Sequence, residues 1–191
     1  GFRPGSLWVI RIEGGNKVSV DERMVHDIVQ KVMANMQISG SVSGMHGVFK
    51  DMNDAINASI EAQKKVCTMT LDQREQIISL IRKKTHENAE ILANMGVNET
   101  GMGNVGDKIL KHHLTADKVP GTEDISTIAW SGDRGLTLVE MGPFGVIGAI
   151  TPATNPSETV ICNCIGMLAG GNTVVFNPHP NAKKTTIYTI N

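Results

Sequence analysis

Two polar, proline-containing loops hold the residues of this chain that are best placed to hydrogen-bond a ligand. They comprise Thr151, Pro152, Ala153, Thr154 and Asn155 in the first loop, and Asn177, Pro178, His179 and Pro180 in the second. Each loop follows a short apolar run with β-branched residues, at 146–150 and 173–176, and such runs predict buried strands. Ligands of open α/β sheets bind beyond the carboxyl ends of the strands, so both loops are expected to line one cleft.

Cysteine thiolates and a histidine pair are the other groups that could act as nucleophiles or hold a metal ion. Cys162 and Cys164 lie in an apolar helical stretch, where burial raises the thiol pKa and leaves the thiol unreactive. We predict core packing for both, and for Cys67 near a helix end. The cysteines have no metal-ligand spacing, which favours an intracellular, reducing compartment such as the cytoplasm. His112 and His113 are adjacent, so they face different sides of a helix and cannot chelate one metal ion.

A glycine pattern at residues 101–106, GMGNVG, matches the dinucleotide-binding fingerprint G-x-G-x-x-G letter for letter. That fingerprint requires a strand immediately before it, and residues 91–95 have a helical pattern instead. We therefore interpret 101–106 as a helix-capping turn and reject it as a nucleotide site.

The two loops are positioned by a predicted βαβ unit. Pro156-Ser157-Glu158 is a typical helix start, and residues 159–169 are apolar without an internal breaker. Gly170-Gly171 is expected to end this helix, because glycine adopts the left-handed conformation of a C-cap. Strand, loop, helix and strand in this order predict two parallel strands joined by a right-handed crossover.

The segment before this unit is predicted to be mainly helical. A first helix is expected within 48–68, with Asp51 or Asn53 as its cap. A long helix is expected at 71–95 and closed by Gly96, and a further helix from about Val105.

A loop with turn signals at 124–133 and an antiparallel or edge strand at 136–141 are then expected to lead into the βαβ unit. The fold class is therefore predicted as α/β, with N-terminal helices followed by the first βαβ unit of a Rossmann-like domain.

Composition excludes several other classes of protein. The chain has 191 residues, is 40% hydrophobic and carries a formal net charge of -1, so it has room for a core and no broad basic surface for nucleic acid. No apolar run approaches the ~18 residues of a membrane span, and no secretory signal is recognisable.

Four stretches resemble the aldehyde dehydrogenase superfamily, and in particular its CoA-acylating branch, the acetaldehyde and propionaldehyde dehydrogenases of bacterial microcompartments. They are GPFGVIGAITPATNP at 142–156, AGGNTVVFNPHPNAK at 169–183, ETGMG at 99–103 and GLTLVEMGPFGV at 135–146. The resemblance covers residues 18–191. It implies that residues 48–191 form the N-terminal part of an NAD-binding domain, with the remaining sheet outside the chain.

The resemblance implies oxidation of a short-chain aldehyde by NAD, with coenzyme A as cosubstrate, to acyl-CoA and NADH. A cysteine thiolate forms a thiohemiacetal and then a thioester, and it lies downstream of this chain, so the fragment alone is expected to be inactive. Asn155 would donate its side-chain amide to the oxyanion, although an asparagine before proline is also a common turn residue.

The cofactor would lie across both loops, according to the same resemblance. Residues 151–154 would line the nicotinamide side and residues 177–180 the adenosine half. Hydrolytic relatives usually carry a lysine at the position of Asn177 and a glutamate at that of Pro180 to hold the ribose, and both are absent here. The site could thus bind NAD differently or tolerate a 2′-phosphate. His179 could contact a ribose or phosphate of NAD or CoA, or simply stabilise its own loop.

The N-terminal residues suggest a separate role. Residues 18–37 form an amphipathic pattern at helical spacing, followed by a Ser/Gly-rich linker at 38–47, whereas 1–17 are a tag or unassigned. The pattern resembles an encapsulation peptide that directs cargo to microcompartment shell protein in the compartment lumen. An ordinary first helix folded on the body is the alternative. Two other functions stay open, a non-catalytic shell-binding module and a hydrolytic aldehyde dehydrogenase, and a homo-oligomer is expected at full length.

Overall fold

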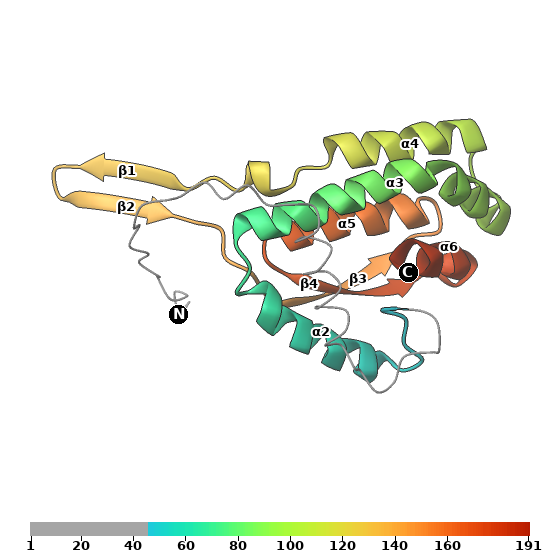
Figure 1. Ribbon diagram of the computed structural model, residues 1–191, viewed down its shortest axis with the longest axis horizontal. Helices are drawn as coiled ribbons and strands as arrows, with labels where there is room; N and C mark the ends of the chain where they lie inside the picture. Colours follow the sequence, from blue (N-terminus) through green and yellow to red (C-terminus); the bar gives the residue numbers. More distant parts are fainter. Residues whose placement is uncertain (1–45) are drawn as a thin grey trace. The chain divides into compact units, whose positions relative to one another are not determined.

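The computed structural model describes residues 46–191, which Figure 1 colours by sequence. The predictions for residues 1–17, for the targeting helix at 18–37 and for most of the linker at 38–47 lie outside the described residues. The chain divides into two units, Gly1–Gln37 and Ile38–Asn191, and every described residue belongs to the second.

Three helices come first, and each begins at a side chain that caps its first turn. They are α2 (Met52–Val66), α3 (Leu71–Thr100) and α4 (Val105–Lys118). Asp51 Oδ1 accepts a hydrogen bond from the Asn53 amide at 2.8 Å, so Asp51 and not Asn53 is the cap of α2. Thr70 caps α3 and Asn104 caps α4 in the same way, which confirms the predicted start of α4. No helix among residues 46–191 is long and apolar enough to cross a membrane.

The prediction that Gly96 ends the long helix is wrong, because α3 continues to Thr100. A glycine inside a helix costs only about 1 kcal/mol relative to alanine, and packing can offset that cost. Gly96 is buried, and a Cβ at this position would lie 3.8 Å from the Lys108 side chain of α4. Gly101, in the left-handed conformation at φ 68°, is the actual C-cap. The stretch 101–106 therefore comprises the turn between α3 and α4 and the first two residues of α4, which agrees with the predicted helix-capping turn.

The next two strands form an antiparallel hairpin. They are β1 (Ile128–Gly132) and β2 (Gly135–Val139), preceded by a 3₁₀ turn, η1 (Thr122–Asp124). β2 confirms the strand predicted at 136–141, whereas β1 corrects the prediction of a loop over 124–133. The register leaves Asp133 and Arg134 as a two-residue turn, the commonest hairpin connection. The turn signals that predicted a loop belong to this turn, and β1 is only five residues long.

The predicted βαβ unit is confirmed. It consists of β3 (Val146–Thr151), α5 (Pro156–Ala169) and β4 (Thr173–Pro178), followed by η2 (Pro180–Ala182) and α6 (Lys183–Ile190). The strands pair in parallel, with Val146 opposite Thr173 and Thr151 opposite Pro178. Of the two glycines after α5, Gly171 is the left-handed one, with φ 77°.

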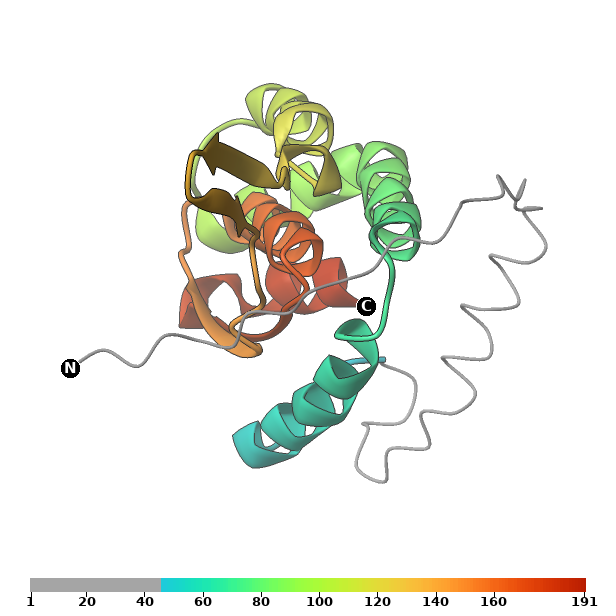
Figure 2. The same cartoon turned by 90° about the vertical axis from the view of Figure 1, so that its left-hand side faces the viewer.

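Helices cover both sides of the two parallel strands. Figures 1 and 2 show α5 on one side and α2 on the other, with α3 and α4 stacked beyond α5. The core lies between α3 and α5, where burial of apolar side chains supplies most of the stabilisation. Its buried members are Ile78, Leu92, Ile161, Ile165 and Ala169. This packing fixes α5 against α3 and so determines where the loop before α5 lies.

Candidate functional site

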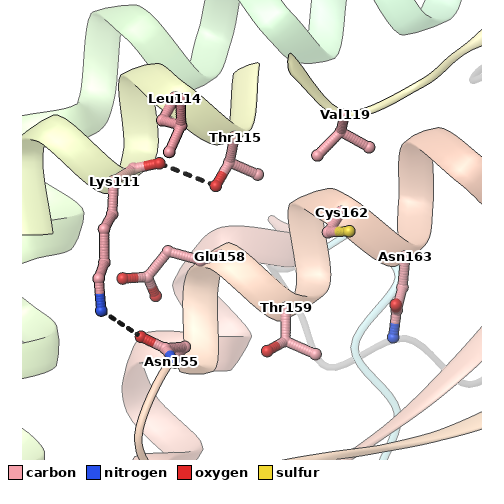
Figure 3. Close-up of a pocket in the computed structure, with 9 residues that line it drawn as sticks. All are labelled: Lys111, Leu114, Thr115, Val119, Asn155, Glu158, Thr159, Cys162 and Asn163. Carbon is pink, nitrogen blue, oxygen red and sulfur yellow. Dashed lines mark hydrogen bonds between the residues drawn. The ribbon is translucent and has the colours of Figure 1, made fainter. Parts of the chain in front are cut away.

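The carboxamide of Asn155 lies at the loop between β3 and α5 and is free of the helix that it precedes. Asn155 occupies the N-cap position of α5 but makes no capping hydrogen bond through its side chain. Its Oδ1 accepts a hydrogen bond from Lys111 Nζ of α4 at 3.4 Å (Figure 3). An ammonium group can only donate, so this contact identifies the oxygen and leaves the Asn155 NH₂ group to donate elsewhere.

Two pockets meet at Asn155 and Lys111. The first has a volume of about 330 Å³ and lies between α4 and α5. Figure 3 shows its lining residues, Lys111, Leu114, Thr115, Val119, Asn155, Glu158, Thr159, Cys162 and Asn163. The second, of about 350 Å³, lies between the 101–106 turn and residues Thr154 and Asn155. Asn155 therefore lines both hollows.

A buried polar network lies directly behind this loop. Lys108 Nζ donates to the carbonyl oxygen of Thr154 at 3.0 Å and lies 3.4 Å from Glu158 Oε1. Lys108 and Glu158 are only 4% and 6% exposed, so this is a buried ion pair. His112 Nε2 lies 2.7 Å from Ser157 Oγ, and His112 Nδ1 lies 2.6 Å from the carbonyl oxygen of Lys108. The network joins α4 to the first turn of α5.

His112 is neutral in this network. Burial lowers the pKa of His112, and this outweighs the opposite effect of the Glu158 carboxylate. The Lys108 carbonyl can only accept, so the neutral ring carries its proton on Nδ1, and Nε2 accepts from the Ser157 hydroxyl. A serine hydrogen-bonded to a histidine resembles an activated nucleophile. Ser157 is 1% exposed and His112 is fully buried, so this pair cannot reach a substrate and its role is structural.

The structure brings the two predicted loops together. Ile150 pairs with Asn177 and Thr151 with Pro178, so both loops leave the sheet at the same edge. Thr151 is buried, and its Oγ1 has no hydrogen-bond partner among the described residues. In the same loop Ala153 is buried, whereas Pro152 and Thr154 are exposed.

The second loop is more open. Asn177, His179 and Pro180 are exposed, and neither pocket includes them. His179 Nδ1 accepts a hydrogen bond from the Asn181 amide at 3.1 Å, which favours stabilisation of its own loop over the ligand contact that was the other interpretation.

The cysteine predictions need correction at two positions. Cys162 is exposed on α5 and lines the pocket beside Asn155, because Ile161 and Ile165 turn the opposite face of the helix into the core. Cys67 is also exposed, at the C-terminus of α2. For Cys164, burial raises the thiol pKa to about 12, as predicted for an unreactive thiol.

The two adjacent histidines face different surroundings, as predicted. His112 is buried against Ser157, whereas His113 stacks on His86 at a centroid distance of 4.9 Å. Within residues 46–191, no group of three potential ligands could hold a metal ion. Sequence reasoning did not find the role of Lys108, Lys111 or Glu158. The spacing of Lys108 and His112, i and i+4 on α4, was a signal for one shared helix face.

Comparison with known proteins agrees with this geometry. The model of the "Aldehyde dehydrogenase family" matches residues 19–191. An acetaldehyde dehydrogenase (acetylating) of Bilophila wadsworthia is 47% identical over 174 residues, which are 86% of this chain and 36% of that protein. The solved propionaldehyde dehydrogenase of the Clostridium phytofermentans fucose utilisation microcompartment is 76% identical, with a TM-score of 0.73 over 75% of this chain and 33% of that one.

A second solved structure shows a ligand. The Rhodopseudomonas palustris propionaldehyde dehydrogenase with bound propionyl-CoA is 48% identical, with a TM-score of 0.73 over 75% of this chain and 32% of that one. The chain thus spans about a third of the length of the relatives that it matches. The family match over residues 19–191, together with the parallel βαβ unit and its loops, shows that the chain belongs to the aldehyde dehydrogenase family.

Proposed function

We propose that this chain forms the N-terminal portion of a CoA-acylating aldehyde dehydrogenase. The reaction is aldehyde, NAD⁺ and CoA to acyl-CoA and NADH. One observation carries the proposal: the Asn155 side chain makes no capping hydrogen bond to its own helix and lines a pocket of about 330 Å³. The names of the acetylating relative and of the propionyl-CoA-bound relative support the acylating activity over the hydrolytic one.

In this proposal Asn155 stabilises charge on the substrate. A cysteine thiolate outside this chain adds to the aldehyde carbonyl, and the oxygen becomes an oxyanion that needs fixed donors. Lys111 holds Oδ1 of Asn155, so Nδ2 is the atom that would donate to this oxygen. Two of the chain's own cysteines are poorly suited as the nucleophile, because the Cys164 thiol has a raised pKa and Cys67 lies at the C-terminus of α2.

The pocket between α4 and α5 is suited to a small aldehyde. Leu114 and Val119 give it an apolar wall, and Thr115 and Thr159 add hydroxyl groups. Its volume of about 330 Å³ is at the small end of ligand sites, which favours a short chain over a long one. Asn155 at its edge would meet the carbonyl end of such a substrate.

The loops at the sheet edge fit a nicotinamide cofactor in part. Beyond the carboxyl end of β3, the exposed Pro152 and Thr154 could line the nicotinamide half, whereas the Thr151 hydroxyl is buried. Residues Asn177 and His179 could contact the adenosine half, and no carboxylate there would repel a 2′-phosphate. When bound, the cofactor would accept the hydride from the thiohemiacetal carbon.

The test is product formation by the complete gene product that contains these residues. Acetaldehyde and propionaldehyde are supplied with NAD⁺, with and without CoA, and both acyl-CoA and free acid are measured. We expect NADH and acyl-CoA to appear together and only with CoA. Acid produced at the same rate without CoA would favour a hydrolytic dehydrogenase, and no NADH in either case would contradict both.

We also propose that residues 18–37 bind microcompartment shell protein through their apolar stripe. The support is the amphipathic pattern and the microcompartment origin of a relative that is 76% identical. Fusion of residues 1–47 to a fluorescent protein, coexpressed with a shell, is expected to give encapsulated fluorescence. A version with Ile28 and Val32 changed to glutamate should stay outside, and equal encapsulation of both would contradict the proposal.

A further inference from the structure

We propose that Lys108, together with Glu158, fixes the position of Asn155. This inference rests on the proposed oxyanion function of Asn155. Lys108 does not line the pocket between α4 and α5, although it lines the second pocket, and it contacts the chain on both sides of Asn155. It donates to the carbonyl oxygen of Thr154, immediately before Asn155, and it pairs with the carboxylate of Glu158, three residues after it.

The loop around Asn155 has few other contacts that could hold it, which argues that Lys108 positions it. Thr154 is exposed and Asn155 is half-buried, so their side chains supply little packing to hold the loop. The loop comes after β3, so strand pairing does not hold it either, and α5 holds only its last residue, through the hydrogen bond from the Thr159 amide to the Asn155 carbonyl at 3.1 Å. The ammonium group of Lys108 belongs to α4, which the core keeps in place through α3. It therefore ties the loop to a rigid part of the molecule.

The choice of a buried ion pair supports the same conclusion. Two charges taken out of water are often no more stabilising than well-packed apolar residues of the same size. Methionine or leucine at positions 108 and 158 would join α4 to α5 as well as the ion pair does, but these side chains could not donate a hydrogen bond to the Thr154 carbonyl. The feature that only the lysine supplies is a hydrogen bond to the backbone next to the proposed oxyanion donor.

His112, one turn after Lys108 on α4, and Ser157 make a second connection between α4 and the first turn of α5. The Ser157 hydroxyl donates to His112 Nε2, and His112 Nδ1 donates to the Lys108 carbonyl. Ser157 lies between Asn155 and Glu158, and its Oγ is 3.2 Å from Glu158 Oε2. The first turn of α5 therefore has two separate connections to α4. Lys111 acts differently, because it is exposed and touches only the side-chain oxygen of Asn155.

The experiment is a double-mutant cycle in the complete gene product. The variant Lys108→Met/Glu158→Met removes both buried charges together and keeps the apolar volume, so it is expected to fold with nearly the native melting temperature. Loss of positioning should lower kcat about 10- to 100-fold, since misplacement of a catalytic group by about 1 Å can have this effect. The KM values for aldehyde and for CoA should change less than about threefold.

The decisive experiment makes the same double methionine change in an Asn155→Ala background and measures kcat. If Lys108 acts through Asn155, the double methionine change lowers kcat no further there, because the group that it positions is gone. An equal fall of kcat in both backgrounds would overturn the inference, and so would native kcat in the folded methionine variant. If Asn155→Ala itself leaves kcat unchanged, the proposed role of Asn155 fails instead, and the two failures are thus distinguishable.

A milder variant covers the case in which the methionine variant does not fold. Ser157→Ala removes one of the two connections and leaves every buried charge paired. We expect it to lower kcat about threefold in the native background and not in the Asn155→Ala background. Native kcat for a folded Ser157→Ala variant would then overturn the inference. Hydrogen exchange of peptide 151–158 should rise in the same variants, while exchange in 161–169 stays native.

Discussion

Two turns of this molecule follow strands, but different contacts hold them in place. The turn between β1 and β2 is local, because the strands pair with each other and every residue of both is exposed. The loop between β3 and α5 is held by a residue 46 positions away in the sequence, Lys108, through a part-buried hydrogen bond to the Thr154 carbonyl. Figure 1 shows the hairpin extending away from the helices, whereas the loop lies among them. The position of the β3–α5 loop therefore depends on how α4 packs against α5, whereas the hairpin turn depends only on its own two strands.

The apolar residues of the two regions differ in the same way. Trp130, Leu136 and Leu138 of the hairpin are more than half exposed, whereas Ile165 of α5 is completely buried. Residues of equal hydrophobicity should therefore have very different effects on the stability of residues 46–191.

Ile165→Ala should give the largest loss of stability. Removal of a fully buried isoleucine side chain leaves a cavity between α3 and α5, which costs about 2–5 kcal/mol of the free energy of unfolding. Urea unfolding followed by circular dichroism measures it. The matched control Leu136→Ala, on the exposed hairpin, should change the free energy of unfolding by less than about 0.5 kcal/mol. Equal losses at both positions would mean that the hairpin is packed in solution.

Asn155→Ala should have the largest effect on activity. Loss of one oxyanion donor is expected to lower kcat about 10²- to 10³-fold in the complete gene product, with the melting temperature almost unchanged. Steady-state NADH formation measures kcat. Asn163→Ala is the matched control, because Asn163 lines the same pocket on the same helix but lies two turns away. If the two variants lose activity equally, the pocket matters and the Asn155 amide has no special role.

Glu99→Ala should have a moderate effect on stability. Helix α6 has no side-chain cap of its own, and Glu99 of α3 supplies one. Its carboxylate accepts hydrogen bonds of 2.7 Å from the Lys184 amide and from the amide and hydroxyl of Thr185. Loss of such a cap costs about 1 kcal/mol. Urea unfolding should show this loss at pH 7, whereas Glu87→Ala, at an exposed ion pair of the same helix, should be nearly neutral.

The effect of Glu99 should also depend on pH. Burial alone would raise the pKa of Glu99, but the hydrogen bonds from Thr185 and Lys184 outweigh it and lower the pKa below 4.5. A carboxyl group with a lowered pKa in the folded state stabilises above its unfolded pKa. The stabilisation by Glu99 should therefore be complete above pH 5 and decrease as the pH falls below 4.5. The difference between native and Glu99→Ala proteins should shrink over this range.

Local patterns were sufficient to predict much of this fold. The start of α4 and both parallel strands depend on neighbouring residues and were predicted correctly, and the cap of α2 was narrowed to Asp51 or Asn53, of which Asp51 is the cap. The end of α3 was not predicted correctly. Glycine often ends a helix, but Gly96 lies inside α3 and packs next to the Lys108 side chain. The strand β1 was missed because its five residues adjoin strong turn signals.

The candidate site was predictable only in part, for the same reason. The two loops lie at strand ends, which the sequence pattern identifies, so their meeting at one edge was expected. Lys108 appears in the sequence as one of 18 lysine and arginine residues, and only its i, i+4 spacing to His112 distinguishes it from Lys111. Its burial depends on how α4 packs against α5, and its partner Glu158 is 50 residues away. Cys162 was misjudged because an apolar helix does not by itself show which face turns inward.

The smallest expected effect is a pH dependence of stability due to His112, which also belongs to the buried network and has no counterpart in the hairpin. Burial lowers the pKa of His112 below 6.5 in the folded state, so the unfolded chain binds the extra proton first as the pH falls. Its contribution to stability should be complete above pH 6.5 and be lost progressively below it.

Urea unfolding of the native chain from pH 7.5 to 5 should show this decrease. The His112→Gln variant, which can still donate and accept a hydrogen bond, should lose the part of the slope that is due to His112. A slope that persists unchanged in this variant would assign the pH dependence to other groups, and would mean that the network tolerates a charged His112.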